Sequence, residues 1–393
     1  MHKTYYDIVV SGAGPAGLLG ACAFGAQGKS VLLVDPIAPV TKKSDPKADL
    51  RTTAFLQPAI DLMREINIWD KLHAYATPIE IMRLADAGGV ANEIRHVADF
   101  NALDIGAAPF GYNLQNTRLK DVLLRHLENT HNVSCQFGHS LQLRSARTTG
   151  VICSFGDMHI QAKALILAEG RNSENRDRLS IQVTRKEYAQ TALVFSVSHT
   201  LPHKNISTEI HRTGGPFTLV PMRDWKGAHC SSVVWMEKNK EAKALVAMSK
   251  AEFTRAVQDR SANVLGALKP ITTPQSFPII HQLADKIGTS NCYLIAETAH
   301  VVPPIGAQGL NISLADIKWL YDNADAISKS DQTDAYHNAR HGDMKLRLRG
   351  IDALNHAAMT DRQVLRDLRL QGLKALSGIS PIRDGLMRKG LGV

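Results

Sequence analysis

Apolar runs and a glycine-rich turn alternate over the first 35 residues and predict a strand–helix–strand unit. Residues 7–10 and 31–34 are short apolar runs of the length typical of buried strands. Between them, apolar residues recur at helical spacing from Leu18 to Ala26, and Gly28 ends that pattern. A helix that joins two buried strands favours a parallel βαβ unit.

The middle of the chain changes from mixed patterns to strict alternation. Alternation dominates residues 188–236, with turns at Gly214 and around Lys226, and predicts a separate antiparallel sheet. The remaining predictions are a loop over 36–50, helices over 52–75, 117–130 and 250–266, and strand pieces within 79–104 and at 151–155, 158–160 and 164–168.

The last hundred residues begin with an apolar strand at 292–296 and a loop rich in Pro and Gly at 300–309. Leu310, Leu314 and Ile317 then open a helical stripe, and the chain from 333 onward is predicted to be helical and basic.

The strongest motif is the sequence Gly-Ala-Gly-Pro-Ala-Gly at 12–17. It follows a predicted strand and opens a predicted helix, which is the context that a dinucleotide-binding GxGxxG requires. Gly12 allows the tight turn, Gly14 lets the backbone approach a pyrophosphate, and Gly17 lets the helix pack on the sheet. Ala16 lies in the first helical turn, where free N–H groups favour phosphate.

Asp35 ends the second strand, where a carboxylate accepts hydrogen bonds from a ribose and repels a 2′-phosphate. There is no second GxGxxG for a nicotinamide cofactor, so the resident dinucleotide is predicted to be FAD. Neither the five widely spaced cysteines nor the paired histidines (337 and 341, 199 and 203) suggest a metal site.

Charge narrows the choice of partners. The chain has 46 Lys and Arg against 37 Asp and Glu, a net charge of +9, and the part from Arg340 onward holds most of this excess. No nucleic-acid-binding module is recognisable. The basic C-terminal region is compatible with a solvated helical face, with peripheral contact with an anionic membrane, or with docking to an acidic protein of the same pathway. With no apolar run of about 18 residues, the expected location is cytoplasmic, or peripheral at the inner face of the membrane.

Three further segments resemble the aromatic-ring flavoprotein hydroxylases. Residues 164–173 resemble the strand and acidic turn that usually ends in Ala-Asp-Gly, and residues 294–311 resemble the motif GDAAH…PPxGGQGxN. The segment from Tyr112 contains Gln115 at the place of a pyrophosphate-facing residue. The Asp-x-Arg turn at Arg51 and the helical tail from Leu365 are most similar to the ubiquinone-biosynthesis hydroxylases.

This resemblance implies an α/β fold with a Rossmann-like FAD-binding domain (1–78, 105–185 and 285–330), an inserted antiparallel substrate domain (79–104 and 186–284) and a helical C-terminal region (331–393). It implies hydroxylation of a polyprenylated phenol through a flavin C4a-hydroperoxide, using dioxygen and an external donor, either NAD(P)H or a ferredoxin. The residues to which it assigns the flavin, its phosphates and the reacting ring edge are Arg51, Gln115, Glu297, Pro304, Gly306, Gly309, Leu310 and Asn311, with Pro304, Gly306 and Arg51 nearest the chemistry.

The chain departs from the family pattern at four positions. Glu169 and Glu297 replace aspartates, while Ala296 and Ala307 replace glycines. A missing glycine strains any position that needs a positive φ. These departures leave open a non-catalytic member of the family that acts as a scaffold. The resemblance also leaves open a hydroxylase of the same fold that acts on a soluble aromatic compound. Phe217, Leu219 and Pro221 either line the substrate pocket or pack in the core.

Overall fold

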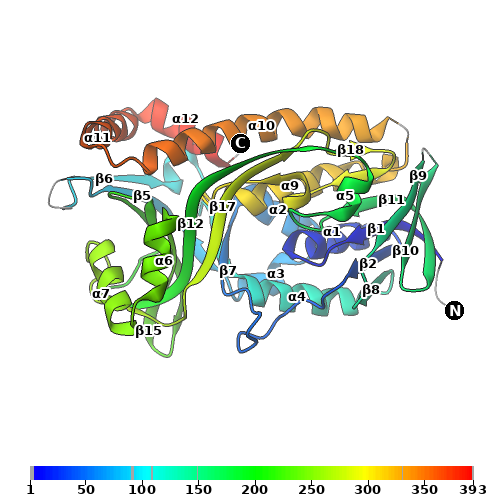
Figure 1. Cartoon of the computed structure of the whole chain (residues 1–393), viewed down its shortest axis with the longest axis horizontal. Helices are drawn as coiled ribbons and strands as arrows, with labels where there is room; N and C mark the ends of the chain where they lie inside the picture. The colour runs from blue at the N-terminus through cyan, green and yellow to red at the C-terminus, as the bar shows by residue number, and fades with distance from the viewer. Residues whose placement is uncertain (1–3, 90–92, 108, 148, 330, 392–393) are drawn as a thin grey trace.

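Two large sheets dominate the computed structural model of the chain, which describes residues 4–89, 93–107, 109–147, 149–329 and 331–391 (Figure 1). A few residues of the predicted domains, including both chain ends, lie outside these ranges. The boundaries of the three domains therefore stay predictions.

The first sheet carries the glycine-rich turn. Its central strands are parallel in the order β19-β11-β1-β2-β8, and the antiparallel strands β18, β10 and β9 extend it. Pairing of Ile8 with Val31 confirms the predicted βαβ unit. The strands are β1 (Tyr5–Ser11), β2 (Val31–Asp35), β8 (Val133–Phe137), β9 (Gln142–Arg147), β10 (Gly150–Phe155), β11 (Met158–Leu167), β18 (Gly288–Thr289) and β19 (Cys292–Leu294).

The second sheet is the predicted antiparallel layer, with one parallel pair between β13 and β5. Its order is β20-β17-β12-β15-β14-β13-β5-β6, and β16 pairs with β12. The strands are β5 (Ile81–Asp86), β6 (His96–Asn101), β12 (Val183–His199), β13 (Ile206–His211), β14 (Pro216–Trp225), β15 (Ala228–Lys238), β16 (Leu268–Pro270), β17 (Gln275–Ala284) and β20 (His300–Val301).

Alternation of side chains gives this second sheet two different apolar faces. Phe217 and Leu219 lie on the face that packs against Phe253 and Val257, and both are almost completely buried. Phe217 and Leu219 therefore pack in the core and do not line a substrate pocket. The opposite face, which includes Met236, packs against residues of the 303–306 loop and of the C-terminal helices.

A small third sheet corrects one prediction. Residues 52–56 were expected to start a helix, but they form β3 (Thr52–Leu56), which pairs with β7 (Gly111–Gln115); β4 (Thr77–Ile79) pairs with the other edge of β7. Thr52, Thr53 and Phe55 are good strand formers, and β7 supplies the hydrogen-bonding partner that a local pattern cannot reveal.

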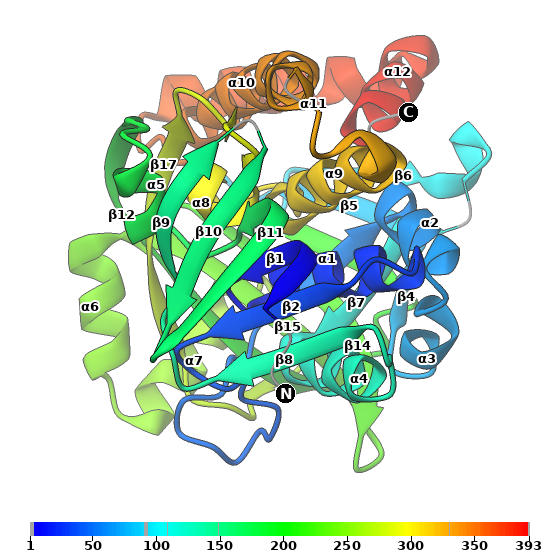
Figure 2. The same cartoon turned by 90° about the vertical axis from the view of Figure 1, so that its right-hand side faces the viewer.

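Helices cover both sheets, and α1 contacts α4 and α9. In Figures 1 and 2 the C-terminal helices α10, α11 and α12 lie together along the upper edge of the molecule. Within the described part of the chain, no helix is both long and apolar enough to cross a bilayer. The helices are α1 (Pro15–Ala26), α2 (Gln57–Glu65), α3 (Trp69–His73), α4 (Asn116–Glu128), α5 (Glu174–Arg178), α6 (Asn239–Ala247), α7 (Lys250–Arg260), α8 (Ala296–Ala299), α9 (Gln308–Asp322), α10 (Gln332–Ala358), α11 (Gln363–Gly378) and α12 (Ser380–Leu391), with the short 3₁₀ turns η1 (Ala102–Ile105) and η2 (Ala324–Ala326).

Candidate active site

The glycine-rich turn has the geometry of a dinucleotide cradle. Gly12 has φ +106°, and a Cβ atom there would lie 2.2 Å from the carbonyl oxygen of Ala168. A Cβ atom at Gly17 would lie 1.8 Å from the carbonyl oxygen of Gly12. A Cβ atom at Gly14, by contrast, would meet no atom within 4 Å. The protein itself therefore requires two of the glycines, whereas the third faces open space of the kind that a pyrophosphate needs.

The beginning of α1 is suited to an anion. Gly14 is the N-cap residue, no side chain caps the helix, and the first turn contains no acidic residue. The free backbone N–H groups around Ala16 and the positive end of the helix dipole thus have no competing partner among the described side chains. The residues present fit the diphosphate of FAD.

Asp35 lies beside this turn, as expected. One carboxylate oxygen accepts a hydrogen bond from the Ala13 amide at 2.6 Å, and the other accepts from the Ile37 amide at 2.7 Å. These bonds fix the carboxylate at the carboxyl end of β2. Its role toward a ribose stays a prediction.

The predicted site residues follow the carboxyl ends of the parallel strands. Gly12 follows β1, Asp35 ends β2, Glu169 follows β11 and Glu297 follows β19. Because parallel strands end at the same edge of a sheet, the fold brings together residues that are far apart in the sequence. This edge is where open α/β sheets usually bind their ligands.

Arg51 belongs to a tight polar cluster. Its Nε and Nη2 atoms each donate to Asp49 at 2.8 Å, and its guanidinium lies 4.5 Å from the centre of the Phe277 ring. Burial by itself would raise the pKa of Asp49, but the Arg51 bonds and a bond from Asn116 outweigh it and lower that pKa to about 2. Asp49 is therefore ionised and holds Arg51 in one orientation.

Gln115 lies next to this cluster, because it ends β7 opposite Thr52 of β3. Its side chain has no hydrogen-bonding partner within the described ranges, and it is the N-cap residue of α4 without capping that helix. A partly exposed amide of this kind can bind a ligand without losing an internal bond.

The loop before α9 carries the remaining predicted residues. The Ile305 amide donates to the Pro303 carbonyl at 2.8 Å, and Gly306 turns the chain with φ +64°. The side chain of Gln308 donates to the Gly306 carbonyl at 3.0 Å. This loop, which contains Pro304, leads directly into Gly309 and Leu310 in the first turn of α9.

Asn311 binds protein backbone with its side chain. Its Oδ1 accepts from the Leu56 amide at 2.9 Å, and its Nδ2 donates to the carbonyl of Ala54 at 2.8 Å and to that of Ala307 at 2.6 Å. The side chain thus anchors the start of α9 on β3. Only its backbone remains available for the predicted contact with a flavin.

The two glutamates that replace aspartates behave differently. Glu169 accepts bonds from Ser11, Ser173 and the side chain of Asn175, so its carboxylate joins β1 to α5. Glu297 is partly exposed and pairs with Nε of Arg171 at 3.0 Å. Of the two, Glu297 is the one whose negative charge helps to raise the pKa of Arg51.

Both alanines that replace glycines adopt left-handed backbone conformations, as the sequence comparison suggested. Ala296 has φ +54° and Ala307 has φ +55°.

We expect Ala296→Gly and Ala307→Gly each to raise the free energy of unfolding by about 0.5–1 kcal/mol. Each substitution relieves backbone strain of about 1–2 kcal/mol, but the greater conformational entropy of glycine in the unfolded chain offsets part of this gain. Urea denaturation measures this change. Ala335→Gly, on an exposed position inside α10, is the control and should lower stability by about 1 kcal/mol. Equal losses for all three variants would contradict the strain.

Sequence reasoning missed a buried ionic cluster behind the loop. Asp316 is completely buried; it accepts from Nε2 of His300 at 2.9 Å and from Nε of Arg340 at 2.9 Å. The cluster ties β20, α9 and α10 together and thereby fixes both ends of the loop before α9. The available signal was a carboxylate between Leu314 and Ile317, on the apolar face of a predicted helix.

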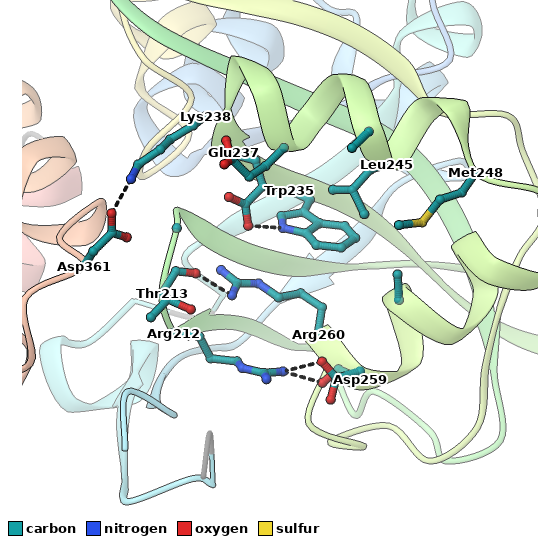
Figure 3. A pocket seen from close by; sticks show the side chains of 14 residues that line it. Arg212, Thr213, Trp235, Glu237, Lys238, Leu245, Met248, Asp259, Arg260 and Asp361 are labelled. Carbon is teal, nitrogen blue, oxygen red and sulfur yellow. Dashed lines mark hydrogen bonds and ion pairs between the residues drawn. The ribbon is translucent and has the colours of Figure 1, made fainter. Parts of the chain in front are cut away.

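A cavity of about 580 Å³ lies elsewhere, between α6, α7 and β15 (Figure 3). It contains the ion pair of Arg212 with Asp259 at 3.2 Å and the bond from the Trp235 indole to Glu237 at 3.1 Å. Burial lowers the pKa of Arg260 in its wall to about 10. Figure 1 shows α6 and α7 at the left end of the molecule, well apart from α1, so this cavity is not part of the dinucleotide site.

Comparisons with known proteins agree with this geometry. The family model described as FAD binding domain matches residues 5–345. Ubiquinone hydroxylase UbiL of Rhodospirillum rubrum is 26% identical, with 98% of this chain and 89% of that protein covered. The 3-demethoxyubiquinol 3-hydroxylase of Escherichia coli is 23% identical, with 98% of both chains covered.

Solved structures share the fold. The p-nitrophenol 4-monooxygenase PnpA of Pseudomonas putida DLL-E4 has a TM-score of 0.79 at 17% identity and covers 99% of both chains. The flavin-dependent monooxygenase PieE, solved with FAD and substrate, has a TM-score of 0.73 at 16% identity, covering 100% of this chain and 72% of that one.

The predicted fold class and the predicted cofactor, FAD, are thus confirmed, and the scaffold alternative loses its support. A family match over most of the chain and a cradle that fits a diphosphate point the same way. The chain therefore belongs to the FAD-binding family of flavoprotein monooxygenases that hydroxylate aromatic rings.

Proposed function

We propose that this protein hydroxylates the ring of a polyprenylated phenol or quinol intermediate of ubiquinone biosynthesis. The observation that carries this substrate class is the match over 98% of the chain to relatives named as ubiquinone hydroxylases. The reaction consumes dioxygen and needs electrons from an external reductant, either NAD(P)H or a ferredoxin.

We assign the FAD contacts by position around the sheet edge. The turn at 12–17 would bind the diphosphate, Asp35 a ribose, and Arg51 with Gln115 the neighbouring polar groups. Glu297 would contact the ribityl chain. When bound, FAD supplies the redox chemistry with dioxygen that delivers an oxygen atom to an electron-rich ring. The residues that would contact the flavin ring are Pro304, Gly306, Gly309, Leu310 and Asn311.

The protein's own contribution is to orient the substrate and exclude water. Pro303 and Pro304 restrict the loop, while the buried side chain of Ile305 packs against Met236 and Ile279 of the second sheet. This apolar contact excludes water from the side of the loop that faces the second sheet. A substrate ring bound on the opposite side of the loop would then be shielded from water. We also assign Phe277, which lies under the Arg51 guanidinium, to the edge of the substrate ring.

The assignment implies a division of the chain into domains. We propose that residues 79–104 and 186–284 form the substrate domain, that 1–78, 105–185 and 285–330 bind FAD, and that 331–393 is a separate helical region. We also propose peripheral contact with the inner face of the cytoplasmic membrane, because a polyprenyl chain partitions into lipid.

The test is a single turnover that does not depend on the natural reductant. The purified, FAD-loaded protein is reduced chemically without air and mixed with isotopically labelled dioxygen and a detergent-solubilised polyprenylated phenol. Mass spectrometry then detects label in the ring. We expect one labelled oxygen atom per product molecule, and none with the same phenol lacking its prenyl chain.

Each other outcome has a defined meaning. Labelling of the unprenylated phenol alone would overturn the substrate class and favour the soluble aromatic compound. A yellow, reducible protein that labels neither phenol would overturn ring hydroxylation. The Gly14→Asp variant is the negative control for label incorporation, because it should not retain FAD.

A further inference from the structure

Helix α11 contacts the protein mainly through polar side chains, beside the buried Leu370. On the inner side, Arg369 donates to Asp86 at 3.1 Å and Asp367 pairs with Arg95 at 2.5 Å. Gln363 donates to the Gly88 carbonyl at 3.3 Å. Asp86 is 1% exposed, so these bonds anchor the helix on the β5–β6 hairpin.

The outer side of α11 is apolar and uncovered. Val364 is 71% exposed and Leu368 61%, and with Leu365 and Leu376 they form one stripe at helical spacing. Ile379, which follows the helix, is 47% exposed. An amphipathic helix of a monomeric protein normally buries such a stripe. The exposed stripe therefore indicates that something else covers it.

The neighbouring helices continue this surface. Leu346 and Leu354 of α10 are exposed opposite the buried side chains of Met344 and Leu348. In both Figures 1 and 2 all three helices lie along the same upper edge of the molecule. We call this surface the apolar ridge; its residues are Leu346, Leu354, Val364, Leu365, Leu368, Leu376, Ile379, Ile382 and Leu386. These are nine of the 20 large hydrophobic side chains that are exposed in the described part of the chain.

Among residues 340–391 the free charge is entirely positive. Each acidic residue from 340 to 391 has a basic partner: Asp343 pairs with Arg340, Asp352 with Lys186, Asp361 with Lys238, Asp367 with Arg95, and Asp384 with Arg383. The basic residues that are exposed and have no partner within the described ranges are Lys345, Arg349, Arg362, Lys374, Arg388 and Lys389.

We infer that the apolar ridge docks the protein on an anionic lipid bilayer, with α10, α11 and α12 lying in the plane of the interface. Apolar side chains flanked by free Lys and Arg are the pattern of interfacial helices. A second copy of the chain fits less well, because a symmetric contact would bring two sets of unpaired cations together. The bonds to Asp86 keep α11 on the protein, so the ridge is rigid before it meets lipid.

This docking would give a membrane-dissolved substrate a short route to the candidate active site. That consequence rests on the proposed function. The inner face of α12 packs with Met387 and Leu391 against Leu56 and Phe110. Gln308, at the end of the 303–306 loop, donates to the Gly390 carbonyl of α12 at 3.3 Å. One helix thus separates the ridge from the loop that we assign to the flavin.

The experiment is co-sedimentation of the FAD-loaded protein with vesicles. Vesicles of phosphatidylcholine alone are compared with vesicles that also contain phosphatidylglycerol, at low and high salt. We expect binding only to the anionic vesicles, weakened by salt. The variant Leu368→Glu/Leu376→Glu should bind about tenfold less. Leu201→Glu, at a residue 52% exposed in the loop between β12 and β13, is the matched control and should bind as the native protein does.

Three results would overturn the inference. They are no binding of the native protein to anionic vesicles, undiminished binding of the double variant, and a native dimer that the double variant converts to a monomer in light scattering. Flavin absorbance of each variant reports whether it is folded. Turnover of the detergent-solubilised phenol should be the same in the double variant, so that failure of docking and failure of the proposed function are distinguishable.

Discussion

Replacing Gly14 with aspartate is expected to abolish FAD binding while leaving the apoprotein folded. The backbone at Gly14 has φ −67° and ψ 174°, which any residue adopts, and its Cβ position has no neighbour within 4 Å. Aspartate is also a favourable N-cap residue, so α1 should lose no stability. The new carboxylate would occupy the space of the diphosphate and repel it. We expect the FAD dissociation constant to rise at least about 100-fold, or about 2.7 kcal/mol.

The measurement is an FAD titration of the apoprotein followed by protein fluorescence, together with its melting temperature. Gly20→Ala is the matched control, because Gly20 lies in the same helix and its Cβ position is equally open. That variant should bind FAD normally. If Gly14→Asp bound FAD as tightly as the native protein, the diphosphate would not lie at this turn.

Replacing Asp316 with alanine is expected to cause a large loss of stability, about 3 kcal/mol. The substitution leaves the buried guanidinium of Arg340 and the ring of His300 without their shared carboxylate. Arg340 would keep its pair with Asp343 at 3.1 Å, but its Nε would lose its acceptor beside an Nη2 that already lacks a partner among the described residues. Urea denaturation of the apoprotein measures the loss.

Asp322→Ala provides the comparison within the same helix. Asp322 pairs with Lys318 on an exposed surface, where such a pair contributes at most about 0.5 kcal/mol. The double variant Asp316→Ala/Arg340→Met should recover part of the stability, since it removes the unpaired charge as well. Similar small effects at both aspartates would mean that the buried cluster does not hold the loop before α9.

The site was predictable where a short segment carries its own geometry. Gly12, Gly14 and Gly17 lie within six residues, and the strand and helix around them have clear periodicities. The αL conformations of Ala296 and Ala307 were foreseeable because glycine is the usual residue there. The strand at 52–56 was not, because its partner β7 lies more than 50 residues further along the chain.

Tertiary contacts decided what the local pattern could not. Alternation along β14 indicates that Phe217 and Leu219 share one face of the sheet. Because both faces of that sheet are apolar, the alternation does not say what covers this face. The packing of α7 on it places both side chains in the core. In the same way, the sequence identifies Asn311 as a residue of the flavin motif, but in the structure its side chain hydrogen-bonds to the backbone of β3.

By itself, the sequence determined the βαβ unit, the cofactor class, the antiparallel sheet and the basic helical tail, because each depends on the period and residue types of one contiguous segment. Only the tertiary structure decided which charges are paired. The acidic residues of the tail find partners such as Arg95 and Lys238 in distant elements, and its unpaired cations are left beside an exposed apolar ridge. Pairing across elements depends on distances in space, which no local pattern encodes.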